Sequence, residues 1–134
     1  MGTRYVSQLE SFLAAGRTLF SFGLIQGAEG NLSTFDGETL VITRTGAALH
    51  ALQPGDVIEG RLAGPLPGAS SDLEVHRERY AADGPGAIAH AHPTGTVPEG
   101  AVESGRHGVY VHAGTLEDAV REAVRLARHQ VVKG

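Results

Sequence analysis

Apolar residues recur at helical spacing in two stretches of this chain, one near each end. The first stretch predicts a helix over residues 3–22, which Thr3 can cap and whose apolar positions are Val6, Leu9, Leu13 and Phe20. The second stretch begins at a capping box of Thr115 and Asp118 and predicts a helix to about residue 129. Its inward face comprises Leu116, Ala119, Val120, Ala123, Val124 and Ala127.

Shorter apolar runs between turn residues predict strands. Residues 32–35 and 38–43 flank Asp36-Gly37, which favours a hairpin. Further strands are expected at residues 57–62, 87–92 and 108–113, a helical turn at 47–52, and a loop at 93–106.

A third helix is predicted between these strands. Ser71 and Glu74 form a capping box, and the helix extends from there to about Ala82. The order is then helix, hairpin, strand, helix, strand, strand, helix. This order predicts one α/β domain over residues 1–134, with a sheet that cannot be wholly parallel and helices on both faces.

Composition narrows the function classes. Lys and Arg total 11 and Asp and Glu total 15, giving a net charge of -4 without a basic patch, so we expect no nucleic-acid partner. The chain has no cysteine, so any metal must be bound by His, Asp or Glu. No apolar run is long enough to span a bilayer and no signal segment is recognisable, so we expect a cytoplasmic protein without a membrane partner.

Two histidines on the predicted strand 87–92 are candidate metal ligands. His90 and His92 are two residues apart, so their side chains point to the same face of a strand. Paired imidazoles on a rigid strand suit a metal site. His107, beside Gly108, is a candidate third ligand. The alternative is that these are ordinary histidines near strand ends.

Three loops have residues suited to binding an anion, namely Gly30-Asn31, Thr45-Gly46 and Ser70-Ser71. They offer hydroxyl or amide groups and free backbone N–H donors, and the last precedes a helix N-terminus. Alternatively, they are only turns and caps. Asp72 either complements the helix dipole or acts as a general acid or base beside a metal. His76 lies one turn along on the same face, and we expect it to orient or pack rather than to bind metal.

The order of these motifs resembles that of the class II aldolase/adducin family. The resemblance covers residues 16–130 and rests on Gly30-Asn31-Leu32-Ser33, Ile42-Thr43-Arg44-Thr45-Gly46-Ala47, Ser70-Ser71-Asp72 with His76, His90-Ala91-His92-Pro93 and His107-Gly108. It implies a three-layer α/β/α sandwich with a largely antiparallel central sheet. It also implies a homo-oligomer, because members of the family are commonly tetramers.

The same resemblance implies roles for the candidate residues. A divalent metal, usually zinc, would be bound by His90, His92 and His107. A substrate phosphate would be bound by Asn31, Thr45, Gly46, Ser70 and Ser71. Asp72 would be the catalytic acid or base. The implied reaction is cleavage of a small ketose 1-phosphate to dihydroxyacetone phosphate and an aldehyde.

The chain departs from the family pattern in three places. The family favours Glu at Asp72, and a displacement of about 1 Å can cost of order 10²-fold in rate. Glu29 and Arg44 replace the usual Gly and Pro, which places a carboxylate near the expected phosphate. Only residues 93–106 separate the second and third histidines, a shorter segment than in family enzymes, and no tyrosine matches the family's tyrosine acids.

These departures leave two alternatives to the aldolase open. The chain could be a non-catalytic domain like the adducin head, because a fold does not fix a function. It could also be an epimerase or a dehydratase that uses the same metal site.

Overall fold

The computed structural model describes residues 2–25, 29–92, 102–103 and 109–133. Within these residues, six strands form one sheet in the order β3-β2-β1-β4-β6-β5, and each neighbouring pair is antiparallel. The strands are β1 (Asn31–Phe35), β2 (Leu40–Thr43), β3 (Val57–Gly60), β4 (Gly86–Ala91), β5 (Val102–Glu103) and β6 (Val109–Ala113). The helices are α1 (Gly2–Ser21), the short 3-10 helix η1 (Leu49–Ala51), α2 (Leu73–Asp83) and α3 (Leu116–Lys133).

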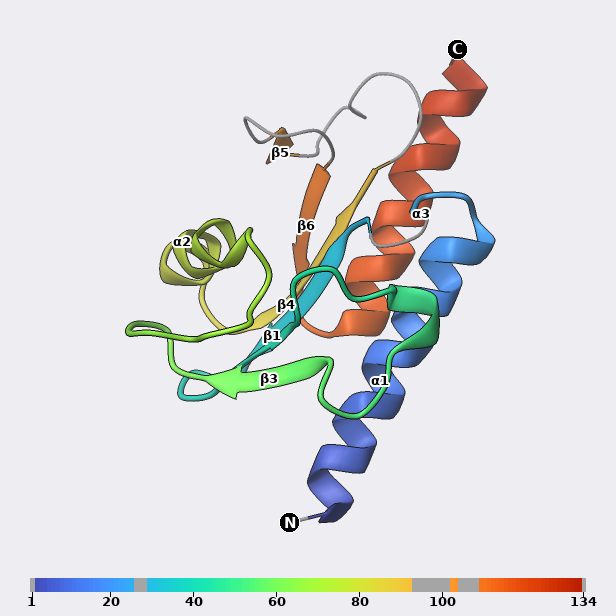
Figure 1. Ribbon diagram of the computed structural model, residues 1–134. Coiled ribbons are helices and arrows are strands. Elements are labelled where there is room, and N and C mark those ends of the chain that lie inside the picture. Colours follow the sequence, from blue (N-terminus) through green and yellow to red (C-terminus); the bar gives the residue numbers. More distant parts are fainter. Residues whose placement is uncertain (1, 26–28, 93–101, 104–108, 134) are drawn as a thin grey trace.

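The sheet lies between two helical layers (Figure 1). Helices α1 and α3 cover one face, and α2 covers the other. The larger apolar core lies on the α1 and α3 side and includes Phe12, Leu19 and Val120. A smaller cluster beneath α2 includes Leu40 and Ile88. The predicted three-layer α/β/α sandwich with an antiparallel sheet is therefore confirmed.

Strand β4 shows how sequence alternation separates the two layers. Ala87, Ala89 and Ala91 belong to the larger core, whereas Ile88 belongs to the cluster beneath α2. Side chains on a strand point alternately to opposite faces, so His90 lies on the same face as Ile88. This alternation places a polar residue under the start of α2.

The predicted hairpin is confirmed, although its loop is longer than two residues. Phe35 pairs with Leu40, so residues 36–39 connect β1 to β2. The Oδ1 atom of Asp36 accepts hydrogen bonds from the N–H groups of Glu38 at 2.8 Å and Thr39 at 2.6 Å. These N–H groups are used in the turn, so β2 begins at Leu40 rather than at residue 38.

Two other boundaries differ from the predictions because of strand pairing. The sequence predicts a loop over residues 93–106, but Val102–Glu103 form β5 and pair with β6. Such a short edge strand depends on its neighbour more than on local pattern. Strand β3 ends at Gly60 rather than at residue 62, because Gly60 pairs with Leu40, the first residue of β2.

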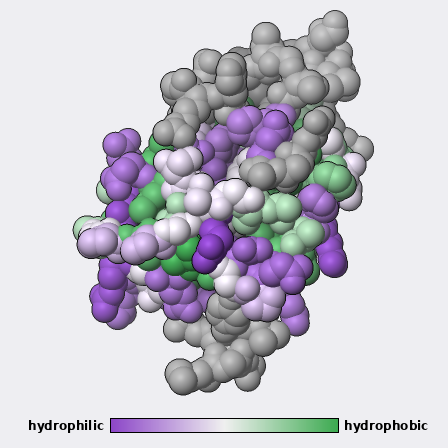
Figure 2. Space-filling model, in the orientation of Figure 1, coloured by the Kyte–Doolittle hydropathy of each residue, from purple (hydrophilic) through white to green (hydrophobic). Residues whose placement is uncertain are grey.

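The surface mixes polar and apolar residues. Figure 2 shows hydrophilic and hydrophobic residues interspersed on the face that it presents. The large apolar side chains on the surface include Phe20, 44% exposed, and Phe22, 49% exposed. In the part of the chain that the structure describes, no helix combines the length and apolar character needed to cross a membrane.

Candidate active site

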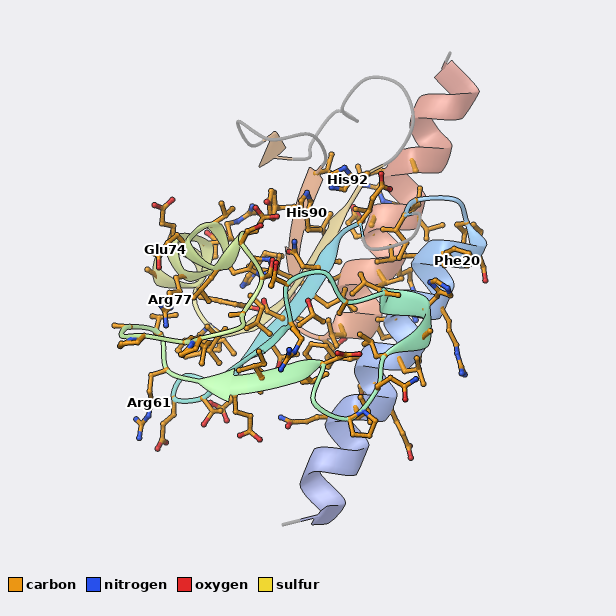
Figure 3. All side chains as sticks on the ribbon, viewed as in Figure 1. Phe20, Arg61, Glu74, Arg77, His90 and His92 are labelled. Atoms are coloured by element: carbon orange, nitrogen blue, oxygen red, sulfur yellow. The ribbon has the colours of Figure 1, made fainter. Side chains whose placement is uncertain are left out.

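A pocket of about 290 Å³ lies where the start of β1 meets the ends of β2 and β4. Its lining comprises Glu29, Gly30, Asn31, Arg44, Thr45, Gly46, Ser70, Ser71, Asp72, His90 and His92. Every site residue predicted from the sequence is in this lining except His107, which lies outside the described residues. Figure 3 shows His90 and His92 beside each other at the end of β4.

Backbone hydrogen bonds join the loop after β2 to the segment before α2. The N–H of Thr45 donates to the carbonyl of Gly68 at 2.9 Å, and the N–H of Ser70 donates to that of Thr43 at 3.0 Å. The sequence predicts free N–H donors in these loops, but these two groups are used within the chain. The loops therefore offer an anion their side-chain hydroxyls rather than these two backbone amides.

Asp72, not Ser71, is the N-cap residue of α2, so the predicted cap at Ser71 is wrong. Asp72 makes no side-chain cap hydrogen bond to the helix, and its own N–H donates to Ser70 Oγ at 3.1 Å. The residue is only 5% exposed, and its carboxylate contacts β1 and β4 instead. A tertiary contact has therefore replaced the local cap.

Asp72 Oδ2 lies beside nitrogen atoms from two strands. It is 2.8 Å from Asn31 Nδ2 and 3.0 Å from His90 Nδ1. The NH₂ group of Asn31 donates to this oxygen, because a carboxylate oxygen only accepts hydrogen bonds. His90 Nδ1 also lies 3.1 Å from Asn31 Nδ2, so it either donates to Asp72 or accepts from Asn31. When the neutral His90 ring carries its hydrogen on Nδ1, its lone pair is on Nε2. Carboxylates fix the tautomer of metal-binding histidines in this way.

The polar contacts continue beneath α2. His76 Nε2 contacts Asn31 Oδ1, and His76 Nδ1 lies 2.6 Å from Ser33 Oγ. Ser33 Oγ in turn lies 2.8 Å from the hydroxyl of Tyr80. Both nitrogens of the buried His76 ring thus have protein partners, which agrees with the predicted orienting or packing role.

Burial sets the protonation of the two aromatic members of this group. Burial first, and His90 second, lower the pKa of His76 to about 3, although Asp72 acts in the opposite direction. The His76 ring is therefore neutral at pH 7. Burial also raises the pKa of Tyr80 above its usual range, so its phenol keeps its hydrogen.

His90 and His92 are held close together at the pocket. Their ring centroids are 4.7 Å apart, and His90 also stacks on Tyr110 with centroids 3.9 Å apart. The N–H of His92 donates to the carbonyl of Leu24 at 2.7 Å. Two imidazoles, one backed by a carboxylate, are a donor set that suits zinc.

A complete metal site needs more than this pair. Among the residues that the structure describes, no group of three His, Cys, Asp or Glu side chains is arranged to hold a metal ion. The third histidine expected from the sequence, His107, lies outside them. The described part of the site therefore supplies two of the three expected ligands.

The family comparison agrees with this geometry. The family model described as the class II aldolase and adducin N-terminal domain matches residues 10–101, which is more than half of the chain. The chain belongs to the class II aldolase and adducin family. The resemblance expected from the motif order is thus confirmed.

Relatives within the class II aldolase and adducin family include a curated protein and solved structures. The chain is 36% identical to a methylthioribulose-1-phosphate dehydratase of Bradyrhizobium over 93 residues, covering 67% of this chain and 43% of the relative. It is 41% identical to the L-fuculose-1-phosphate aldolase of Thermus thermophilus, covering 66% of this chain and 46% of that one, with a TM-score of 0.60. The chain therefore spans less than half of either relative.

A third relative supports the fold alone. YgbL of Klebsiella pneumoniae, a putative aldolase/epimerase/decarboxylase, is 21% identical to this chain and has a TM-score of 0.75. The alignment covers 97% of this chain and 91% of YgbL. At this identity, the likeness extends to the class II aldolase architecture and not to the reaction.

Sequence reasoning missed the polar contacts behind the family motifs. Ser33 lies two residues after Asn31 on β1, and Tyr80 lies one helical turn after His76 on α2. Each pair therefore shares one face of its element. Spacing alone could have identified Ser33 and Tyr80 as candidate partners of the predicted site residues. It could not have predicted that the side chains of β1 and α2 contact each other.

Proposed function

We propose that this chain carries a metal-dependent lyase site for a small sugar phosphate. The observation that supports it most strongly is the single pocket that brings His90 and His92 together with Asp72 and the hydroxyl-bearing loops. The preferred reaction is cleavage of a ketose 1-phosphate to dihydroxyacetone phosphate and an aldehyde. Family membership supports the class of reaction, and the named relatives support a phosphorylated sugar substrate.

In this proposal, His90, His92 and His107 hold one divalent metal, preferably zinc. The metal would supply Lewis acidity by polarising substrate oxygens. Asp72 contributes to the metal site indirectly, through its contact with His90 Nδ1. The donor set supports zinc because imidazole nitrogens are common zinc ligands.

The substrate phosphate would bind Asn31, Thr45, Gly46, Ser70 and Ser71. These residues line one pocket. The N-terminus of α2 adds a partial positive charge there. A phosphate fixed in this way would hold the reacting carbons beside the carboxylate and the histidines, and such positioning contributes to rate.

Asp72 would move the proton during the reaction. When the bond between carbons 3 and 4 of the ketose breaks, its electron pair passes toward the carbon 2 carbonyl. Carbon 3 then takes up a proton, which we assign to the carboxyl group of Asp72. The Asp72 carboxylate takes the proton that the carbon 4 hydroxyl loses as the aldehyde forms, and this is the proton that it passes to carbon 3, so the cleavage balances.

Dehydration is the second candidate, and the curated relatives favour it. Two of them carry names that include methylthioribulose-1-phosphate dehydratase, at 36% and 35% identity. The same site would serve this reaction if Asp72 removed the proton beside the carbonyl and the next hydroxyl left as water. The products separate the two reactions, because cleavage yields two fragments and dehydration yields one.

The experiment is a product assay on zinc-loaded protein with a panel of ketose 1-phosphates and methylthioribulose 1-phosphate. Dihydroxyacetone phosphate would establish the aldolase, and a product lighter by one water would establish the dehydratase. Asp72→Asn should abolish either reaction, whereas His112→Gln, away from the pocket lining, should retain it. Zinc-loaded protein that makes neither product would favour a non-catalytic or epimerase domain.

A further inference from the structure

A buried row of polar side chains leads from α2 to the pocket. It consists of Tyr80, Ser33, His76, Asn31 and Asp72, in that order of contact. The exposed fractions are 0% for Ser33 and His76, 1% for Tyr80, and 5% for Asn31 and Asp72. Burying a polar group costs free energy unless the group is hydrogen-bonded, so the stability of the fold depends on the contacts in this row.

The hydrogen positions along this row follow from its pocket end. The carboxylate of Asp72 accepts only, so Asn31 must face it with the NH₂ group. Asn31 Oδ1 is then an acceptor, and the His76 nitrogen that contacts it, Nε2, must carry the hydrogen. A neutral imidazole has one such hydrogen, so His76 Nδ1 accepts.

Ser33 and Tyr80 form the far end of the row. Because His76 Nδ1 accepts, the hydroxyl of Ser33 donates to it at 2.6 Å. The Ser33 oxygen then accepts from the hydroxyl of Tyr80 at 2.8 Å. Every donor therefore points toward the pocket, and this arrangement leaves no contact in the row with two donors or two acceptors facing each other.

The opposite orientation of Asn31 would break two contacts at once. Turning its amide over would place Oδ1 against the carboxylate of Asp72 and the NH₂ group against the His76 N–H. The first pair would be two acceptors and the second two donors. His76 thus holds the Asn31 amide from behind, while Asn31 lines the pocket with its NH₂ group beside Asp72.

We propose that His76 is a positioning residue that, through hydrogen bonding from Nε2, keeps the donor end of Asn31 turned toward Asp72 and a bound anion. This rests on the proposed function in one respect, namely that the pocket binds the phosphate of a substrate. His76 itself does not line the pocket. It acts only through Asn31.

The first test is anion binding, measured by calorimetric titration of the zinc-loaded protein with inorganic phosphate. His76→Leu removes the donor to Asn31, and we expect about tenfold weaker phosphate binding, the size of one charge-assisted hydrogen bond. His76→Gln supplies an amide donor and should recover most of the affinity. His112→Leu removes a histidine whose ring packs against Tyr80 but hydrogen-bonds to the carbonyl of Gly84 rather than to a member of the row, and it should leave phosphate affinity unchanged.

The second test determines the hydrogen positions in the row in the absence of any ligand. Nitrogen-detected NMR of the His76 ring should show a neutral ring with its hydrogen on Nε2, and the Asn31 NH₂ signals should shift in His76→Leu. The position of the hydrogen on the His76 ring is measured in the wild-type protein. The proposal can therefore be tested even if a His76 variant is too unstable for calorimetry. A hydrogen on His76 Nδ1 at pH 7, or Leu and Gln variants that bind phosphate like the wild type, would overturn the proposal.

The two measurements separate this inference from the proposed function. If the wild type binds neither zinc nor phosphate, the lyase proposal fails. The NMR spectra then decide the positioning role alone, with unchanged Asn31 signals in His76→Leu counting against it. If the wild type binds both and all His76 variants do as well, only the positioning role fails.

Discussion

The Nδ1 atom of His90 lies 3.0 Å from Oδ2 of Asp72, and the two side chains are 2% and 7% exposed. The contact joins the strand that carries two candidate metal ligands to the first residue before α2. In the proposed mechanism, this contact would give the short carboxylate of Asp72 a second task beside proton transfer, which is to fix the tautomer and orientation of His90.

Removing the charge of Asp72 should therefore weaken metal binding as well as activity. We expect Asp72→Asn to bind zinc about 10-fold more weakly, because loss of a carboxylate behind a histidine ligand costs 10–100-fold in metal affinity or activity. Competition with a fluorescent zinc chelator measures this affinity. Zinc affinity equal to that of the wild type would show that Asp72 does not support His90.

The buried neutral His76 should make the fold sensitive to acid. Burial lowers the pKa of His76 in the folded state to about 3, from 6.5 for an exposed histidine, so its neutral form stabilises the fold above pH 6.5. That stability is lost as the pH falls below 6.5 toward 3, because the unfolded state binds the proton first. Between pH 6.5 and 5 the loss is roughly 2 kcal/mol, at 1.36 kcal/mol per pH unit.

Urea denaturation at pH 7 and pH 5 measures this dependence, with His76→Gln as the comparison because glutamine does not titrate. The wild type should lose more stability on acidification than the variant does. The same loss in both proteins would assign the acid sensitivity to other groups.

Gly30 should be intolerant of a side chain for two reasons. Its φ is 79°, a conformation that disfavours other residues, and an added Cβ would lie 2.7 Å from the carbonyl oxygen of His90. Gly23 has a similar φ of 72° but no atom within 4 Å of such a Cβ. Gly23→Ala should cost roughly 1–2 kcal/mol, and Gly30→Ala should cost more by about 1–3 kcal/mol for the clash.

Thermal and urea unfolding of both glycine variants give the comparison. The difference between the two measures the close approach of the loop before β1 to the end of β4. Equal losses of stability would mean that the backbone at Gly30 moves away from His90 without cost.

The two exposed charges at the pocket should act on phosphate binding in opposite directions. Glu29→Gln removes a like charge and should strengthen inorganic phosphate binding about threefold, whereas Arg44→Gln should weaken it by a similar factor, as expected for solvent-screened charges. Both effects should shrink at high salt. Titration at two salt concentrations tests this, and an unchanged affinity in both variants would place the anion away from the loop that carries Arg44.

Local pattern was sufficient for most of the fold. The apolar spacing of α1 and α3 and the Asp36-Gly37 turn predicted those elements, because their signals lie within a few neighbouring residues. The short strand β5 was missed because its pairing with β6 determines it. The cap of α2 was misassigned because Asp72 contacts Asn31 and His90 rather than its own helix.

The candidate site was also predictable only in part. The order of the motifs identified the pocket residues, and the structure brings together those that it describes. The contact between Ser33 and Tyr80 joins residues 47 positions apart, and no local spacing predicts such a pairing. Partners of this kind follow from the register of β1 against β4 and from where α2 packs, which are properties of the folded chain.

We expect β4 to carry part of a metal site, and zinc content tests this most directly. Purified protein should bind one zinc ion per chain, His92→Ala should lose it, and His112→Ala should retain it. Added zinc should also raise the melting temperature of the wild type, because a ligand that binds only the folded state stabilises it. Full zinc content in His92→Ala, or wild-type protein that neither carries zinc nor is stabilised by it, would contradict the account.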